Sequence, residues 1–432
     1  MSHTAAPPTP NALTLPADAL LVKYDKAGPR YTSYPTADRF VEAYGAADYQ
    51  QALALREQVP QQYPLSLYVH IPFCEALCYY CGCNKIITKQ KSRAAHYLAL
   101  LKQEIALHAA ALGRRKPQVS QLHLGGGTPT FLSDDGLREL MSMLKRSFTL
   151  APGGEYSIEV DPRTVTPERL AVLAGLGFNR LSFGVQDFDP AVQKAVHRVQ
   201  PAEQVFALVA AAREREFDSV NVDLIYGLPR QSPESFDRTL AQVTELRPDR
   251  IALYAYAHLP ERFKPQRRIA TVELPGGPAK VAMLARSMAA FMEAGYIYVG
   301  MDHFALPDDA LAVAKRQGRL HRNFQGYSTQ PDCDLVALGI SAIGRIGSSY
   351  YQNAKTLPEY DEALQQRRLP IVRGYALTAD DLMRRDIIMA IMCQGRLDIG
   401  RIERVHGIRF DYAFANELRA LDALAQAGLV TR

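Results

Sequence analysis

Short apolar runs alternate with amphipathic, helix-like patterns along most of the chain, and the unit of one strand and one helix repeats six times. The predicted strands cover residues 65–71, 120–124, 156–160, 180–185, 219–227 and 250–256. The predicted helices cover residues 92–111, 134–146, 167–175, 202–215, 233–246 and 280–293. Strands that alternate with helices in this way pair in parallel through right-handed crossovers. The pattern therefore predicts an α/β fold with a parallel sheet.

Glycine, proline and charged residues gather where several of the predicted strands end. The segments are GGGTPT, DPR, GLP and HLP, after the second, third, fifth and sixth strands. The carboxyl ends of parallel strands lie on one edge of a sheet, and barrel enzymes carry their active sites there. This edge is the predicted functional rim.

The remaining segments carry other patterns. Residues 1–20 are rich in Pro, Ala and Thr and predict a flexible arm, and residues 28–36 hold too much Pro and Tyr for a helix. A mixed pattern extends to residue 372, and a helical, Arg- and Leu-rich pattern begins at Leu377. We expect three parts: an N-terminal arm covering the barrel mouth (1–60), a barrel with flanking elements (61–372) and a C-terminal helical domain (373–432).

Composition and charge are those of an ordinary globular protein. The chain has 432 residues, of which 47% are hydrophobic and 22% charged, and its formal net charge is +5. Without a long basic run, this charge suits an acidic small molecule at least as well as a nucleic acid, and we predict no nucleic-acid partner. No segment reaches the roughly 18 uninterrupted apolar residues of a membrane helix, and no targeting peptide is visible. We expect a cytoplasmic protein with reduced thiols and no membrane partner.

Four of the six cysteines lie within ten residues, in the segment HIPFCEALCYYCGCNK directly after the first strand. Zinc usually takes two separated pairs of ligands, whereas the other two cysteines, Cys333 and Cys393, are distant singletons. A disulfide framework conflicts with a reducing compartment. The spacing of Cys74, Cys78 and Cys81 suits three irons of an iron–sulfur cluster and leaves a fourth iron open. A zinc or structural site is the alternative.

A CxxxCxxC loop after a first barrel strand resembles the radical S-adenosylmethionine (SAM) enzymes. Further along the chain, the motifs YVHIPFC, CGCNK, GGGTPT, EVDPR, FGVQDF, NVDLIYGLP, YAHLP, GMDHFA and HRNFQGY follow in this order. Together they resemble the oxygen-independent coproporphyrinogen III oxidases over about residues 20–425. The resemblance implies an incomplete (βα)6, TIM-like radical SAM barrel with an N-terminal arm. It also implies a small helical C-terminal domain, a shortened form of the family's winged-helix-like domain.

The resemblance also implies an activity with its cofactors and partners. The family converts two propionates of coproporphyrinogen III to vinyl groups by oxidative decarboxylation, which gives protoporphyrinogen IX in haem biosynthesis. A [4Fe-4S] cluster and two SAM molecules are the implied cofactors. A flavodoxin- or ferredoxin-like reductant protein and an unidentified electron acceptor are the implied partners, and we expect a monomer.

The resemblance assigns residues to each of these groups. The cluster would be ligated by Cys74, Cys78 and Cys81. The first SAM, on the open iron, would use Tyr68, Gly126, Glu159 and Ile343. The second SAM would use Tyr80, Gly127, Thr128, Gln186, Arg198, Asp223 and Ala257. Residues implied in turnover but not in ligation are Cys83, Phe324 and Gln325.

From the residues alone, several of these positions have a second interpretation. The glycines before Thr128 can form a plain tight turn as readily as a ligand-binding loop. Glu159 and Asp161 can cap the following helix, and Arg198 can be a solvated surface charge.

Basic and aromatic residues near the predicted rim are equally open to two interpretations. Substrate propionates would suit basic side chains, but a solvated basic loop is as compatible, for Arg262, Lys264, Arg267, Arg268 and Arg322. The N-terminal tyrosines can cover the barrel mouth or serve as packing residues, at Tyr24, Tyr31 and Tyr34.

Two alternative functions belong to different classes. Haem-chaperone-like relatives share the three-cysteine loop and the barrel but lack oxidase activity, and they typically lack a fourth cysteine in the CGC position. Cys83 and Gln325 therefore favour the oxidase. The other alternative is a binding module in which a structural cluster supports a protein or haem interface.

Overall fold

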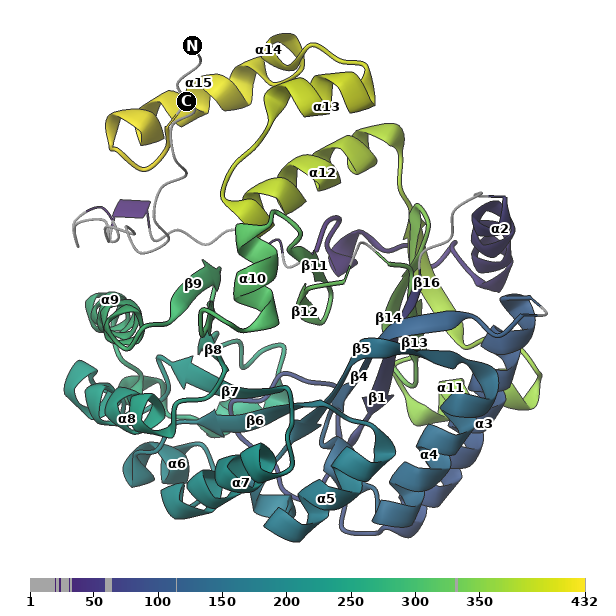
Figure 1. The fold of residues 1–432 in the computed structure, drawn as a ribbon, viewed down its shortest axis with the longest axis horizontal. Helices are drawn as coiled ribbons and strands as arrows, with labels where there is room; N and C mark the ends of the chain where they lie inside the picture. The colour runs from purple at the N-terminus through teal and green to yellow at the C-terminus, as the bar shows by residue number, and fades with distance from the viewer. Residues whose placement is uncertain are drawn as a thin grey trace.

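The computed structural model describes residues 20, 23–24, 31, 33–58, 64–113, 115–330 and 333–431. Its centre is a twelve-stranded sheet in the order β16-β15-β14-β13-β1-β4-β5-β6-β7-β8-β10-β9 (Figure 1). The strands are β1 (Leu65–Ile71), β4 (Gln118–Gly126), β5 (Thr149–Val160), β6 (Arg180–Gln186), β7 (Ser219–Tyr226), β8 (Arg250–Ala255), β9 (Ile297–Gly300), β10 (His303–Ala305), β13 (Leu335–Leu338), β14 (Ile343–Ile346), β15 (Ser349–Asn353) and β16 (Ile371–Ala376).

The six predicted strand–helix units form the middle of this sheet. Strands β1, β4, β5, β6, β7 and β8 are parallel neighbours in chain order. Their helices lie along one face of the sheet (Figure 1) and are α3 (Ser92–Ala111), α4 (Asp134–Ser147), α5 (Pro167–Leu176), α7 (Ala202–Glu214), α8 (Pro233–Leu246) and α9 (Gly277–Glu293). The α/β fold with an incomplete (βα)6 barrel is confirmed.

Alternating burial explains why these segments form strands and helices. Along β6 and β7 buried and partly exposed residues alternate, so that one face joins the helix-covered core. Phe183 and Val222 are completely buried on that face, and Leu240 of α8 is 3% exposed. The opposite positions, such as Ser182 and Asp223, face the barrel interior and carry polar side chains.

The mixed pattern after residue 294 contains eight further strands in its described residues, six of them in the central sheet, which the sequence pattern did not resolve. At one edge β13 pairs in parallel with β1, and β14, β15 and β16 continue as an antiparallel sheet. At the other edge β10 pairs antiparallel with β8 and β9. These strands have three to six residues, and such short apolar runs have no distinctive period.

Shorter elements connect the sheet to the site and to the outer layer. Two small sheets pair β2 (Phe73–Cys74) with β3 (Ile86–Ile87), and β11 (His321–Asn323) with β12 (Gly326–Ser328). The remaining helical elements of the described barrel region are α6 (Pro190–Ala195), α10 (Ala310–Arg316), α11 (Leu357–Gln365) and the 3-10 turns η2 (Pro129–Phe131), η3 (Pro162–Thr164), η4 (Lys264–Arg268) and η5 (Thr271–Glu273).

Both ends of the chain pack outside the six units. Most of residues 1–32 lie outside the described residues; the described N-terminal segment contains η1 (Ala37–Arg39) and α2 (Ala46–Glu57), and its Val41 pairs with Gly374 of β16. The C-terminal region is helical as predicted, with α12 (Ala379–Gln394), α13 (Ile399–His406), α14 (Phe410–Ala413) and α15 (Ala415–Gln426) around a small apolar cluster of its own. The division at residues 60 and 372 stays a prediction, and residue 372 falls within β16. None of the described helices combines the length and apolarity needed to cross a bilayer.

Candidate active site

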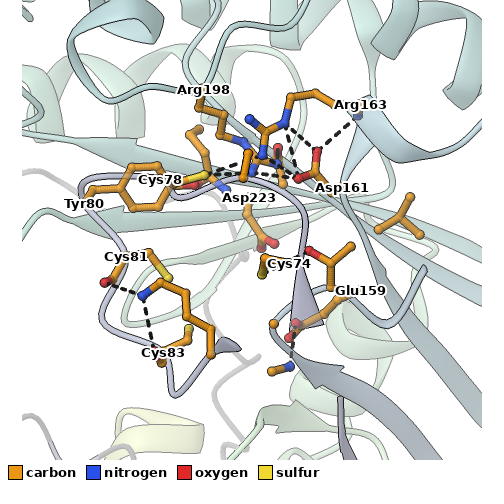
Figure 2. A pocket seen from close by; sticks show the side chains of 18 of the residues that line it. Cys74, Cys78, Tyr80, Cys81, Cys83, Glu159, Asp161, Arg163, Arg198 and Asp223 are labelled. Atoms are coloured by element: carbon orange, nitrogen blue, oxygen red, sulfur yellow. Dashed lines mark hydrogen bonds and ion pairs between the residues drawn. The ribbon is translucent and has the colours of Figure 1, made fainter. Parts of the chain in front are cut away.

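The cysteine loop lies at the carboxyl end of the parallel strands. It leaves β1 through β2 and returns at β3, and backbone hydrogen bonds from Ile86 to Pro72 (2.7 Å) and from Thr88 to Cys74 (2.9 Å) close its base. All four clustered cysteines line one cavity of about 710 Å³, part of it open to solvent (Figure 2). The same cavity is lined by residues from the ends of β4, β5, β6 and β7. The loop therefore faces the predicted rim.

The donor set in this cavity fits an iron–sulfur cluster. In the described part of the chain, no three His, Cys, Asp or Glu side chains converge on a point where one metal ion would sit. Thiolates that bind a cubane each take a different iron, so they have to line a shared cavity and need not converge on one point. Cys74, Cys78 and Cys81 meet that requirement, and as soft ligands they suit iron–sulfur chemistry.

The surroundings of the thiols differ from one cysteine to the next. Burial raises the pKa of the Cys74 thiol to about 11, although the Thr128 hydroxyl donates to its sulfur at 3.4 Å. A hydrogen bond with Cys83 and the nearby Lys85 ammonium outweigh burial and lower the pKa of the Cys81 thiol to about 6. Lys85 Nζ also donates to the carbonyls of Cys81 (3.0 Å) and Cys83 (3.3 Å). Lys85 thus holds the end of the loop.

The glycine segment after β4 brings backbone close to the cysteine loop. Gly126 has φ +111°, and a Cβ atom there would lie 2.5 Å from the His70 ring. A Cβ atom on Gly127 would lie 2.7 Å from the Pro72 carbonyl group. Both positions therefore need glycine. The Gly126 amide donates to Glu159 Oε2 at 3.1 Å, so the segment is more than a plain turn.

Glu159 is held by a chain of side chains that starts in β1. His123 Nε2 lies 3.2 Å from Glu159 Oε1, and the His123 ring stacks on Tyr68 with 5.9 Å between centroids. The Tyr68 hydroxyl lies 3.0 Å from His70 Nδ1. Burial alone would raise the pKa of Glu159, but His123 and the Gly126 amide outweigh burial and hold the pKa below its usual value. Glu159 is therefore poised as a carboxylate on the cavity wall.

Asp223 faces Glu159 from β7 and has the opposite shift. Ser182 Oγ donates to Asp223 Oδ2 at 3.0 Å, and Asn221 Nδ2 lies 2.9 Å from Oδ1. Burial, followed by the charge of Glu159, raises the pKa of Asp223 from its usual 3.8 to about 6. Burial disfavours the charged form, which would gain from a cationic or hydrogen-bonding ligand.

The Asp223 shift predicts a pH-dependent stability. The folded carboxyl keeps its proton up to about pH 6, whereas the unfolded one loses it near 3.8, so stability from this group is lost as the pH rises between these values. For Asp223→Asn in the absence of SAM, we expect the unfolding free energy relative to the original chain to increase by up to about 3 kcal/mol between pH 4 and pH 8. Denaturant titrations at both pH values measure it. A difference that does not vary with pH would contradict the prediction.

Arg198 lies buried between the Asp161 carboxylate, the Cys78 thiol and a backbone carbonyl. Its Nη1 is 3.2 Å from Asp161 Oδ2 and 3.5 Å from Cys78 Sγ, and its Nη2 donates to the Gly184 carbonyl at 2.6 Å. The side chain is 8% exposed, which excludes the solvated-surface interpretation. Gln186 ends β6 with φ +69° and lines the same cavity.

One buried glutamine joins two residues predicted for the second SAM. Gln266 Nε2 donates to the carbonyls of Tyr80 (2.9 Å) and Ala257 (3.1 Å), and its Oε1 accepts the Leu259 amide at 2.6 Å. The segment after β8 is thereby tied to the cysteine loop. Gly82 of the loop also packs closely against the segment after β8, because a Cβ atom added to Gly82 would lie only 3.0 Å from the Phe263 ring.

A second cavity continues from the first into the barrel interior. The two cavities share Glu159, Ser182 and Asp223, and the second is also lined by Gln325 from the turn between β11 and β12. Phe324 instead packs edge-on against Phe40 (6.3 Å) and Tyr350 (5.7 Å), and Ile343 begins β14. The catalytic roles of Phe324 and Gln325, and that of Ile343 toward the first SAM, stay predictions.

Several basic residues predicted near the rim contact aromatic rings or a carbonyl group of the protein itself. The guanidinium of Arg268 lies 5.3 Å from the Tyr79 ring centroid, that of Arg262 lies 5.5 Å from the Phe263 centroid, and that of Arg322 lies 4.5 Å from the Tyr327 centroid. Arg267 Nε donates to the Pro260 carbonyl at 3.0 Å. Binding of substrate propionates by these residues or Lys264 stays a prediction.

The predicted tyrosine cover is partly described. Tyr31 and Tyr34 form an edge-on pair at 5.7 Å, and the Tyr34 carbonyl accepts the Tyr350 hydroxyl at 3.1 Å. For Tyr24, the Lys23 ammonium lies 5.2 Å from the ring centroid. A role of these tyrosines over the barrel mouth stays a prediction.

Sequence reasoning missed several residues of the cavity wall. Arg163, Lys85 and Ser182 line it, and His123 supports Glu159. The alternation of polar and apolar residues within β4 and β6 could have indicated His123 and Ser182 as polar positions on one face, and in the sheet they pair with Tyr68 and Glu159. Arg163 carries no comparable signal, since a single arginine after a strand is usually a surface charge.

An open barrel with a CxxxCxxC loop over its carboxyl-terminal edge defines a radical SAM protein, and the sequence model of the Radical SAM superfamily matches residues 68–243. The chain belongs to the oxygen-independent coproporphyrinogen III oxidases. It is 50% identical to the enzymes of that name from Salmonella typhimurium and Pseudomonas aeruginosa, over 95% of this chain and 89% of each relative. The coproporphyrinogen III oxidase structure from Escherichia coli, described as a radical SAM enzyme, superimposes with a TM-score of 0.90 at 49% identity, over 96% of this chain and 93% of that chain.

Proposed function

We propose that this chain catalyses the oxygen-independent oxidative decarboxylation of two propionate side chains of coproporphyrinogen III to vinyl groups. The observation that carries the proposal is the cysteine loop over a polar barrel cavity in a chain that is 50% identical to named oxidases over nearly its full length. The reaction itself makes a radical cofactor necessary. A propionate β C–H bond has no adjacent carbonyl group to acidify it, so a side-chain base cannot remove this proton at a useful rate.

When bound, a reduced [4Fe-4S] cluster and SAM supply a 5′-deoxyadenosyl radical that abstracts a hydrogen atom from the substrate. Each propionate then loses CO₂ and one electron as the vinyl group forms. In our proposal Cys74, Cys78 and Cys81 hold three irons, and Tyr68, Gly126, Glu159 and Ile343 orient the first SAM. The Glu159 carboxylate suits an ammonium or ribose partner because His123 keeps it ionised.

The second SAM is proposed to lie at the ends of β6 and β7. Its site would be formed by Tyr80, Gly127, Thr128, Gln186, Arg198, Asp223 and Ala257. Two observations support this site. Six of these residues, all except Ala257, line the same cavity, and Gln266 bridges Tyr80 and Ala257. Arg198 would meet a carboxylate, and Asp223 an ammonium or hydroxyl group.

We therefore expect Arg198→Ala and Asp223→Ala to lower SAM binding from two molecules per chain to one while iron content is unchanged, because neither residue is a proposed cluster ligand. Vinyl product should fall by at least about tenfold, since removal of a buried charge-assisted contact costs on the order of 1.5–3 kcal/mol. Equilibrium dialysis with labelled SAM measures the stoichiometry. Two bound SAM molecules in both variants would refute the second site.

The test of the function as a whole is an anaerobic assay with coproporphyrinogen III, SAM, a reductant for the cluster and a bacterial cell extract that supplies the electron acceptor. We expect protoporphyrinogen IX and 5′-deoxyadenosine as products, and SAM cleavage without vinyl product would refute the oxidase assignment. For the remaining partners we propose a flavodoxin- or ferredoxin-like reductant protein, an electron acceptor of unidentified nature and a monomeric state. Because the clustered thiols need a reducing compartment, we propose the cytoplasm as the location.

A further inference from the structure

Two guanidinium groups contact the sulfur of one proposed cluster ligand. Arg163 Nη2 and Arg198 Nη1 each lie 3.5 Å from Cys78 Sγ (Figure 2). Both also bind Asp161 Oδ2, at 2.6 Å and 3.2 Å. Cys78 is 8% exposed, so these charges act on it with little solvent between them. Two guanidinium groups therefore contact the Cys78 sulfur directly, whereas Cys81 has one ammonium group, that of Lys85, nearby.

The local sequence holds Arg163 in this position. Asp161 caps the turn η3, and its Oδ1 accepts the Arg163 backbone amide (3.1 Å) and Arg163 Nε (3.0 Å). Pro162 between them has a restricted φ and suits the first position of the turn. The Asp161 side chain is 9% exposed and that of Arg163 is 20% exposed. The Asp161 carboxylate thus holds Arg163 at two points, the backbone amide and the guanidinium group.

Hydrogen bonds and positive charge at a cluster sulfur favour the state with the additional electron. Arg198 is already proposed to bind the second SAM, whereas Arg163 has no proposed role toward SAM. We propose that Arg163, held by Asp161, is a positioning residue that raises the reduction potential of the cluster through the positive charge of its guanidinium group beside Cys78 Sγ. The proposal rests on the proposed function, because it takes Cys78 as a cluster ligand.

The experiment is a redox titration of the cluster followed by electron paramagnetic resonance, on the full chain without SAM or substrate. At the midpoint potential of the original chain, we expect the ratio of reduced to oxidised cluster in Arg163→Gln to fall about tenfold, which is 59 mV for one electron. Arg163→Lys keeps the charge and should change the ratio by less than about threefold. Arg56→Gln is the matched control, because Arg56 in α2 also forms an ion pair, at 2.6 Å, with Asp334 before β13. The side chains of Arg56 and Asp334 are 10% and 18% exposed. We expect no change for that variant.

Each result bears on the proposal. An unchanged potential in Arg163→Gln with full iron content would overturn it, as would equal shifts in the Gln and Lys variants, because charge would then not be the cause. Loss of iron in Arg163→Gln alone would assign the residue to cluster assembly and would also overturn it. If the original chain itself forms no cluster, the proposed function fails, and that failure is recognised before any variant is compared.

Discussion

Cys74→Ser, Cys78→Ser and Cys81→Ser should each lose the oxygen-sensitive brown chromophore, with iron falling from about four atoms per chain to nearly none. The three sulfurs line one cavity, and each is proposed to hold a different iron. A serine hydroxyl is a hard, poorly ionised ligand, so it cannot replace a thiolate at an iron corner. Loss of one corner leaves two attachments for a group that needs three.

Iron content and absorbance after anaerobic purification measure this prediction. Cys333→Ser is the matched control, because Cys333 is a buried cysteine outside the cavity, with its sulfur 3.9 Å from Ser120 Oγ. It should keep its iron. If the original chain were colourless and held zinc, the iron–sulfur assignment would be wrong for all three cysteines.

Cys83→Ser should keep the cluster's iron and spectrum but lose most of the decarboxylation. One residue separates Cys83 from Cys81, so both thiolates on one cubane would form a cramped chelate. A fourth protein thiolate would also block the iron that SAM needs. Cys83 nevertheless lines the same cavity and hydrogen-bonds with Cys81. A thiol at that place suits proton or electron handling near the substrate, or packing against it.

Iron and vinyl product should be measured on the same anaerobic sample of Cys83→Ser. Cys81→Ser serves as the comparison, because it should lose both. If Cys83→Ser loses its iron, Cys83 is a ligand and the open iron does not exist. If it retains full activity, Cys83 has no part in turnover, and the fourth cysteine no longer distinguishes the oxidase from the chaperone-like relatives.

Local patterns in the sequence were sufficient for the six strand–helix units. For most of these helices and strands, the predicted and observed bounds differ by only a few residues. The prediction succeeds because burial of one face imposes a period on each segment. The antiparallel strands β14 to β16 were not predicted. Each of these strands is short. In addition, α11 separates β15 from β16 along the chain, so the pairing of β16 depends on contacts between distant segments.

The sequence by itself also determined the chemistry of the cysteine loop, because the spacing of Cys74, Cys78 and Cys81 is a local property that limits what they can ligate. Tertiary structure alone decided which groups surround those thiols. Arg163 and its partner Asp161 follow β5, Arg198 follows α6, and the fold brings both guanidinium groups to Cys78. The opposite pKa shifts of Glu159 and Asp223 likewise arise from burial and from His123 on another strand. Electrostatic effects depend on distance and solvent exclusion in three dimensions, and neither is encoded in the spacing of residues along the chain.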